Sequence, residues 1–236
     1  MRPRGKGRHE EGAAGGSGAG GATVTDRDAR SQAAAVFDAL GIRYEQAFAH
    51  SAAHRASLDR LSAHLGPHSR VLDVGSGTGR PTAATLAAAG HEVLGVDVSP
   101  VMVELAARQV PQASFRCADI RDLPLDEGSF DAVCVYFALL QMSRRDQQAV
   151  VRRLVRAVRP SGIVVLATVP LDVDRAEGVF LGQPVRVTSF AEEDFVRMAT
   201  AAGLTVVSRQ SHLFTPAAPG ATPEPHLFLH CRRTAG

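Results

Sequence analysis

The stretch Val71-Leu72-Asp73-Val74-Gly75-Ser76-Gly77-Thr78-Gly79 joins an apolar run to three glycines at alternate positions, and a helical pattern follows from Pro81. Glycine at these positions lets the chain turn sharply and lets a ligand approach without meeting a Cβ atom. In open α/β sheets, ligands bind at the carboxyl ends of the parallel strands. The stretch therefore predicts a strand, a ligand-binding loop and a helix in succession.

Strand and helix patterns alternate on the carboxyl side of this loop. Short apolar runs predict strands, and apolar residues at helical spacing predict helices. We expect strands at 71–74, 91–98, 113–118, 130–137, 163–168, 204–208 and 226–231, and helices at 81–89, 101–108, 144–158 and 192–202. This alternation is typical of an α/β fold with a doubly wound, mostly parallel sheet and helices on both faces.

The remaining segments are expected to differ in character. Residues 1–28 are rich in Gly, Ala and Arg and predict a disordered tail, since they offer little apolar surface to bury. Residues 31–65 have helical spacing, and Gly41 is expected to divide them into two helices. The turn Arg159-Pro160-Ser161-Gly162 should close the helix at 144–158. The segment 170–190 is interpreted as a long loop, either a lid over a site or a surface excursion.

Three aspartates each follow or end a predicted strand on the side of the glycine loop. Asp73 precedes the first glycine, Asp97 ends the next strand, and Asp119 ends the one after it. A carboxylate can accept hydrogen bonds from an ammonium group, from the two hydroxyls of a ribose, or from an exocyclic amine. Each aspartate could instead cap the helix that follows it. Because three aspartates stand at successive strand ends beside the glycine loop, a ligand site is favoured over three separate helix caps.

The spacing of the glycines argues against two common nucleotide sites. A dinucleotide-binding fingerprint requires a third glycine at position 80, where this chain has Arg80. A phosphate-binding P-loop is excluded because no Gly-Lys-Ser/Thr follows. An acidic residue before the loop also suits a cationic ligand better than a pyrophosphate.

Composition limits the partners that we expect. The 236 residues carry a formal net charge of +2, with much of the basic excess in the first nine residues, so nucleic acid is not expected as a partner. No apolar stretch is long enough to span a membrane, and no secretory signal is evident. The three cysteines lie far apart without ligand-like spacing, which favours a reducing, cytoplasmic location and predicts no metal site.

Five motifs together resemble those of class I S-adenosylmethionine-dependent methyltransferases. They are Asp73-Val-Gly-Ser-Gly-Thr-Gly79, Gly95-Val-Asp97-Val-Ser99-Pro100-Val-Met102, Ala118-Asp119-Ile120, Phe130-Asp131-Ala-Val and Arg159-Pro160-Ser-Gly162. The resemblance covers roughly residues 36–232. Gly79-Arg80-Pro81-Thr82 and Phe180–Val187 are similar to small actinobacterial methyltransferases of natural-product pathways.

The resemblance implies a seven-stranded sheet in the order 3-2-1-4-5-7-6 with strand 7 antiparallel, and S-adenosylmethionine as the cofactor, with S-adenosylhomocysteine as product. Asp73 and the loop backbone would bind its methionine part, Asp97 its ribose, and Asp119 the far edge of its adenine. The cofactor-binding residues implied in this way are Tyr44, Asp73, Gly75, Ser76, Gly77, Thr78, Gly79, Asp97, Val98, Met102, Asp119, Ile120 and Tyr136. Tyr44 is interpreted as a lid tyrosine, the alternative being an aromatic that only packs its helix.

The residues that would contact the methyl acceptor are less clearly indicated by the sequence. Tyr136, Phe137 and Gln141 follow the fourth strand, where the transferred methyl group should point, and Gln141 stands where family members often have histidine. His50 and His54 lie four residues apart and are expected to share a helix face. We interpret this pair as solvated, or alternatively as a base or acceptor ligand. A general base is needed only for a hydroxyl or protonated amine.

The function predicted from the sequence is methyl transfer from S-adenosylmethionine to an O, N or C atom of a small, partly apolar acceptor. An alternative is a protein of this fold that binds the cofactor for a non-methylating role, such as a cyclase or isomerase. A nicotinamide-dependent oxidoreductase is disfavoured by Arg80. Oligomeric state and acceptor identity are left open.

Overall fold

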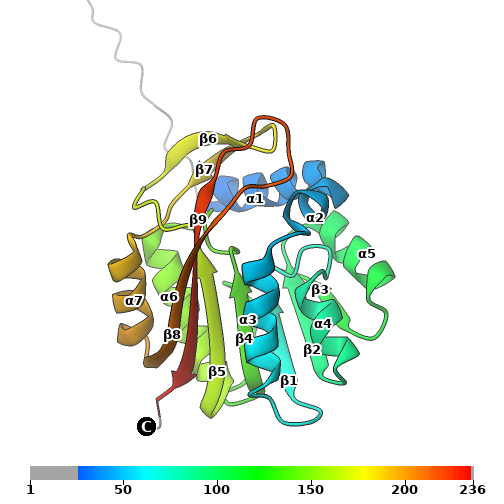
Figure 1. The fold of residues 1–236 in the computed structure, drawn as a ribbon, viewed down its shortest axis with the longest axis vertical. Coiled ribbons are helices and arrows are strands. Elements are labelled where there is room, and N and C mark those ends of the chain that lie inside the picture. The colour runs from blue at the N-terminus through cyan, green and yellow to red at the C-terminus, as the bar shows by residue number, and fades with distance from the viewer. Residues whose placement is uncertain (1–25, 235–236) are drawn as a thin grey trace, which may run out of the picture.

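The computed structural model describes residues 26–234, in which seven strands form one sheet in the order β3-β2-β1-β4-β5-β9-β8 (Figure 1). The strands are β1 (Arg70–Val74), β2 (Glu92–Asp97), β3 (Ser114–Cys117), β4 (Phe130–Tyr136), β5 (Val158–Thr168), β8 (Leu204–Phe214) and β9 (Glu224–Arg233). The first five pair in parallel, and β9 is antiparallel to both of its neighbours. The predicted strand order and the antiparallel last strand are therefore confirmed.

Helices cover both faces of this sheet (Figure 1). They are α3 (Ala52–Ser62), α4 (Thr82–Ala88), α5 (Pro100–Gln109), α6 (Arg144–Ala157) and α7 (Glu192–Ala201). One buried cluster joins α3 and α4 to the sheet, and another joins α6 and α7 to it. The chain thus folds as the doubly wound α/β unit that its alternating pattern predicts.

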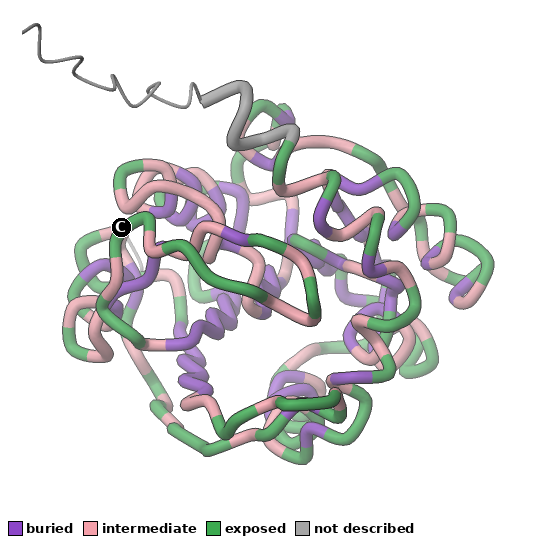
Figure 2. The backbone as a smooth tube through the Cα atoms, turned by 90° about the horizontal axis from the view of Figure 1, so that it is seen from above, coloured by how far each residue is buried: buried purple, intermediate pink, exposed green. Residues whose placement is uncertain are grey.

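The two clusters are separated because successive strand residues point to opposite faces. In β4, Val133 and Val135 belong to the cluster under α6 and α7, whereas Ala132 and Cys134 belong to the cluster under α3 and α4. Burying a valine or leucine side chain completely stabilises a fold by about 1.5–3 kcal/mol. Seen from above (Figure 2), buried segments run through the middle of the molecule and exposed segments lie around them.

A cap lies over the end of the sheet at which the parallel strands terminate (Figure 1). It consists of α1 (Asp26–Leu40), α2 (Ile42–Phe48) and a two-stranded hairpin of β6 (Ala176–Phe180) and β7 (Gln183–Val187). The buried Val36, Leu40 and Val185 hold it together, with Phe37, Tyr44, Phe180, Leu181 and Val187 packed against them.

The N-terminal helices differ from the expectation in number. Gly41, with φ 49°, separates α1 from α2 as predicted. A second break follows α2, because the Ser51 hydroxyl accepts a hydrogen bond from the His54 amide and so begins α3 as its N-cap. Three helices therefore occupy the region in which two were predicted. The expected tail lies outside the described residues except for residues 26–28, which begin α1.

The segment 170–190 is not a plain loop, because it contains the hairpin of β6 and β7. Phe180 pairs with Gln183, so that Leu181 and Gly182 form a two-residue turn. Both have positive φ, 49° and 83°, as a type I′ turn requires. The hairpin escaped prediction because leucine is unusual in such a turn.

The start of β5 also differs from the expectation. The helix α6 ends at Ala157, and β5 begins at Val158 rather than at Ile163. Val158 pairs with Phe130 and Ile163 pairs with Ala132, so the four residues predicted as a turn form a bulge in this strand. The last two strands are longer than predicted, and β8 continues to Phe214.

Candidate active site

The glycines after β1 serve two different purposes. Gly75 has φ 68°, and a Cβ atom there would lie 2.4 Å from the Cβ of Ala138, so the loop packs tightly against the end of β4. Gly77 has φ 52°, and the nearest atom to a Cβ placed there is in the ring of Tyr44, 4.0 Å away. The backbone at Gly77 is therefore open to a ligand.

Gly79 and Thr78 lie outside the two cavities described below. A Cβ atom at Gly79 would come within 3.1 Å of Phe115 and of Val110. The Thr78 hydroxyl donates a hydrogen bond of 2.6 Å to Glu45 on α2. These two residues fix the loop against α5 and the cap, and the structure does not place them where a ligand would touch their side chains.

Two adjoining cavities open beside the loop. Cavity A has a volume of about 200 Å³ and extends from Asp97 beneath the cap, and cavity B has a volume of about 290 Å³ and reaches Asp73. Seven residues line both cavities and so mark their junction: Tyr44, Phe48, Gly75, Gly77, Tyr136, Phe137 and His226. Most of the predicted cofactor residues are brought together around these two spaces.

Asp73 is the most unusual residue of cavity B. It is 2% exposed, and its Oδ2 has no hydrogen-bond partner among the described residues. Burial, with a smaller effect from Asp97, raises the pKa of this carboxyl from 3.8 to about 7. A buried carboxylate oxygen without a partner is costly unless a ligand donates to it. A cationic donor would compensate both the burial and the repulsion from Asp97.

Asp97 at the end of β2 shapes the loop and also lines cavity A. Its Oδ2 accepts from the Gly77 amide and its Oδ1 from the Ser99 amide, both at 2.9 Å. Burial raises the pKa of Asp97, and these backbone bonds oppose that rise. Because each carboxylate oxygen has two lone pairs, both can accept a further hydrogen bond from a ligand such as a ribose.

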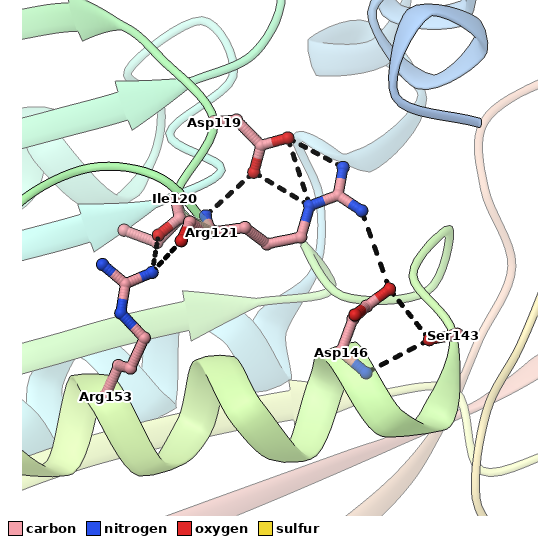
Figure 3. Close-up of polar contacts among 6 residues, drawn as sticks. All are labelled: Asp119, Ile120, Arg121, Ser143, Asp146 and Arg153. Carbon is pink, nitrogen blue, oxygen red and sulfur yellow. Dashed lines mark hydrogen bonds and ion pairs between the residues drawn. The ribbon is translucent and has the colours of Figure 1, made fainter. Parts of the chain in front are cut away.

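The expected adenine end of cavity A is lined by Val98, Met102 and Ile120, as predicted, together with Arg121. Asp119 does not line it. The Asp119 carboxylate accepts hydrogen bonds from the Arg121 amide and guanidinium, with Nη2 2.7 Å from Oδ2 (Figure 3). This pairing leaves Arg121 rather than Asp119 facing the cavity.

Arg121 is in turn connected to α6 (Figure 3). Its Nη1 lies 3.8 Å from Asp146, whose backbone amide is capped by the Ser143 hydroxyl. Further along the helix, Arg153 donates to the carbonyl oxygens of Ile120, Arg121 and Leu123. The loop after β3 is therefore held in place by α6 and not only by the sheet.

Tyr44 stands between the cap and the cavities. Its ring packs edge-on against Phe37, and its centroid lies 5.0 Å from that of Phe48 and 6.3 Å from that of Phe180. Burial raises the pKa of its hydroxyl, with further contributions from nearby carboxylates, so the group is neutral. The residue thus packs against aromatic neighbours and also lines both cavities, and its role as a lid tyrosine stays a prediction.

Tyr136, Phe137 and Gln141 all line cavity A, and the first two also line cavity B. Phe137 has φ 60°, an unfavourable value for an aromatic residue, at the sharp turn that ends β4. The buried Tyr136 hydroxyl lies 2.9 Å from the Ser57 hydroxyl, which lies 2.8 Å from Nε2 of His230. This network fixes the Tyr136 ring, and burial raises the pKa of its hydroxyl.

The predicted histidine pair does not share a helix. His50 is exposed in the turn before α3 and lines neither cavity, whereas His54 lies in α3, lines cavity B and stacks on Tyr136. Burial, followed by effects of His226 and Arg55, lowers the pKa of His54 to about 3. So weak a base is poorly matched to proton abstraction near neutral pH.

Sequence reasoning missed His226, which was assigned no role. It is 1% exposed, lies at the start of β9 and lines both cavities. Its Nε2 is 2.8 Å from the Glu224 carboxylate, and its Nδ1 has no hydrogen-bond partner in the described part of the chain. The pattern Glu224-Pro-His226 on a terminal strand offered only a weak signal, because the pairing depends on the fold.

Other kinds of site are limited within the described residues, 26–234. No group of three or more His, Cys, Asp or Glu side chains in this range is arranged to hold a metal ion. None of its helices combines the length and apolar character needed to cross a membrane.

The comparisons with known proteins agree with this geometry. Residues 71–162 match a family model described as a methyltransferase domain. Among solved structures, the 1,6-didemethyltoxoflavin-N1-methyltransferase of Burkholderia thailandensis, with S-adenosylhomocysteine bound, aligns with a TM-score of 0.68 at 24% identity, over 90% of this chain and 91% of that one. The [4+2]-cyclase SpnF aligns with a TM-score of 0.69 at 18% identity, over 88% and 97%. The fold is that of these solved structures, and residues 71–162 are similar to a methyltransferase domain.

Two of the curated relatives align with less than half of this chain. A demethylmenaquinone methyltransferase of Beutenbergia cavernae is 40% identical over 48% of this chain and 45% of its own length. The methyltransferase GfsG of Streptomyces halstedii is 35% identical over 42% of this chain and 37% of its own. The chain thus spans about half the length of the demethylmenaquinone methyltransferase and little more than a third of the length of GfsG.

Proposed function

We propose that this protein transfers a methyl group from S-adenosylmethionine to an O, N or C atom of a small, largely apolar acceptor. The single observation that carries the proposal is the buried Asp73 carboxylate, whose Oδ2 is unpartnered among the described residues, beside the open backbone of Gly77. A sulfonium cofactor with a free ammonium group matches this combination, whereas a pyrophosphate does not. The methyltransferase-domain match supports the same cofactor.

The residues fit the cofactor in two parts. Asp73 and the Ser76–Gly77 backbone in cavity B would receive its methionine part, and the buried Ser76 hydroxyl, unpartnered within the described range, offers a further hydrogen bond there. Asp97 would receive the ribose, and Val98, Met102 and Ile120 the adenine, in cavity A. Arg121 would take the edge position that the sequence suggested for Asp119, and it would donate to a ring nitrogen of adenine rather than accept from the amine.

When bound, the cofactor supplies an already activated methyl group, so the chain mainly has to orient the reactants and exclude water. Orientation of this kind can lower a barrier by about 7–11 kcal/mol. The cap of α1, α2 and the β6–β7 hairpin is placed to exclude water, since Tyr44, Phe48 and Phe180 pack together above the cavities. Phe37, Phe180 and Val185 give cavity A an apolar lining suited to the acceptor.

The proposal extends to a secondary-metabolite acceptor, for which the support is the apolar lining of cavity A and the similarity to GfsG and to two fungal O-methyltransferases. We also propose that the protein acts in the cytoplasm on a free small molecule, without nucleic acid or membrane. The alternative role, cofactor binding without methyl transfer, requires the same cavities.

Incubation with methyl-labelled S-adenosylmethionine and a panel of phenols, amines and activated methylenes tests the proposal. We expect label to enter at least one acceptor, with one S-adenosylhomocysteine formed for each product. Tight cofactor binding without transfer to any acceptor would favour the non-methylating alternative. Failure to bind the cofactor would contradict both roles.

A further inference from the structure

We propose that His226, oriented by Glu224, is the general base of this enzyme and that its acceptor is a planar, apolar molecule with a hydroxyl group, such as a phenol. This inference rests on the proposed methyl transfer and deepens it by naming the base and the acceptor class. It is carried by the His226–Glu224 pair, by the position of the pair at the cavity junction, and by the lining of cavity A.

The pair has the arrangement that a base requires. Because the Glu224 carboxylate can only accept, the 2.8 Å contact places a proton on Nε2 of a neutral His226 and leaves the lone pair on Nδ1. Nδ1 is buried and makes no hydrogen bond to any residue that the structure describes. A buried acceptor without a donor is unfavourable unless a ligand supplies one. An acceptor hydroxyl would be such a donor.

The position of His226 matches the place where the methyl group would be transferred. The sulfonium joins the methionine and adenosine parts of the cofactor, and these parts are assigned to cavities B and A. The methyl group must therefore lie near the junction of the cavities, which His226 lines together with Phe137. The ring centroids of these two residues are 4.4 Å apart.

The fold brings the pair to this junction through the antiparallel last strand. Leu227 pairs with Thr168 at the carboxyl end of β5, so the beginning of β9 lies at the edge of the sheet that carries the glycine loop. A parallel strand in this position would place its first residues at the opposite edge. Because β9 is antiparallel to β5, Glu224 and His226 lie at the same end of the sheet as the glycine loop, although they are distant from it in the sequence.

The lining of cavity A defines the acceptor class. Aromatic rings of Phe37, Phe48, Phe137 and Phe180 surround the space beneath the cap, with aliphatic Leu140 and Val185 beside them. Flat apolar molecules fit between such rings. The polar group of the acceptor would meet His226. A neutral hydroxyl is a poor nucleophile until its proton is removed, so methyl transfer to such an acceptor requires a general base.

Methyl transfer and removal of the hydroxyl proton occur together in the proposed step. The acceptor oxygen forms a bond to the methyl carbon while its proton passes to Nδ1 of His226. The carbon–sulfur bond breaks, and its electron pair remains on sulfur as S-adenosylhomocysteine forms. The resulting imidazolium is stabilised by the Glu224 carboxylate until it releases the proton to solvent.

The test compares four forms of the full chain: wild type, His226→Gln, Glu224→Gln and the control His212→Gln. The amide introduced by His226→Gln can still donate to Glu224 but cannot act as a base. His212 pairs directly with His226 across β8 and β9, is exposed and lines neither cavity. Thermal unfolding verifies that each variant is folded, and calorimetry with S-adenosylhomocysteine verifies the cofactor site independently of turnover.

Methyl transfer is then measured in a mildly acidic buffer, in which 7-hydroxycoumarin keeps its proton and the thiol of 4-nitrothiophenol is already ionised. We expect His226→Gln to lower transfer to the phenol by about 10²–10⁴-fold. Transfer to the thiolate and the affinity for S-adenosylhomocysteine should change by less than about threefold in the same variant. Glu224→Gln should lower phenol transfer by a smaller factor, and His212→Gln should behave as wild type.

A spectroscopic measurement adds a readout that does not depend on turnover. In the complex with S-adenosylhomocysteine, bound 7-hydroxycoumarin should show more of the phenolate absorption band with wild type than with His226→Gln. Equal phenolate fractions together with equal transfer rates would overturn the assignment of the base. Failure of the wild type to bind or methylate the phenol, while it methylates other acceptors, would overturn the acceptor class. Absence of cofactor binding in the wild type would instead contradict the proposed function itself.

Discussion

Asp73 combines a burial that is unfavourable for its carboxylate with a proposed role in cofactor binding. Its carboxylate is buried, close to Asp97 and short of one hydrogen-bond partner within the described range. Replacement by the isosteric Asn removes the charge that an ammonium group would need. We expect Asp73→Asn to weaken binding of S-adenosylhomocysteine by about tenfold or more, since a hydrogen bond to a charged group contributes about 1.5–3 kcal/mol. Calorimetry measures this change.

Asp131 supplies a matched control for that experiment. It is a strand aspartate that accepts a hydrogen bond from the Arg70 amide and forms an ion pair with Arg159, and it lines neither cavity. Asp131→Asn should lower thermal stability and leave the affinity unchanged, whereas Asp73→Asn should leave stability unchanged or raise it. The same affinity for wild type and Asp73→Asn would rule out the proposed ammonium contact.

The raised pKa of Asp73 also predicts a pH dependence of stability. The pKa is about 7 in the folded chain and 3.8 is its ordinary value. Between these values the folded state binds a proton that the unfolded state has lost, so the Asp73 contribution lowers stability as pH rises from about 4 to about 7. Urea unfolding should show the advantage of Asp73→Asn over wild type growing across this window and levelling above it. A constant difference would mean that Asp73 is ionised throughout.

At the scale of elements, α6 supports the proposed cofactor site, although none of its residues lines cavity A or cavity B. Arg153 donates to three carbonyl oxygens of the loop after β3 and lines neither cavity. Arg153→Leu leaves those carbonyls without their donor and should lower both the unfolding temperature and the affinity for S-adenosylhomocysteine. Arg152→Leu, at an exposed position of the same helix, is the control. An unchanged affinity in a clearly destabilised Arg153→Leu would show that the loop does not depend on this contact.

The cap has to move if a ligand is to enter the cavities beneath it and then be closed off from water. Tyr44 and Phe48 of α2 pack against Phe180 of the hairpin, so the two pieces should open and close together. We expect hydrogen exchange in residues 36–50 and 170–190 to slow when S-adenosylhomocysteine binds. The outer turns of α7 serve as an internal reference, because they lie on the far side of the sheet from cavity B. Exchange that does not change in the cap would mean that it is no lid.

The sequence predicted the parts of the molecule that depend on local pattern. The glycine loop and Asp97 follow from motifs with fixed spacing, whereas the strand order and the places of Val98 and Met102 were implied by the resemblance to a known family. The structure has this strand order and brings these residues to the cavities. The hairpin in 170–190 was missed because its turn residues, Leu181 and Gly182, are not a usual turn pair. The length of β5 was missed because its bulge contains Pro160.

The rest of the site could not be predicted because it depends on contacts between distant residues. Asp119 and Arg121 are close in sequence, but which of the two side chains faces the cavity depends on how the distant Arg153 of α6 holds the loop after β3. His226 reaches the junction of the cavities only because β9 runs antiparallel to β5. No short-range pattern in the sequence encodes either relation.

For the molecule as a whole, the central claim is that cavities A and B together bind S-adenosylmethionine as a methyl donor. Calorimetric titration of the full chain with S-adenosylhomocysteine and, separately, with NAD⁺ tests this claim most directly. We predict binding of one S-adenosylhomocysteine per chain, weakened by Asp73→Asn, and no heat of binding for NAD⁺. Binding of NAD⁺ in place of S-adenosylhomocysteine, or binding of S-adenosylhomocysteine that is insensitive to Asp73→Asn, would contradict the account.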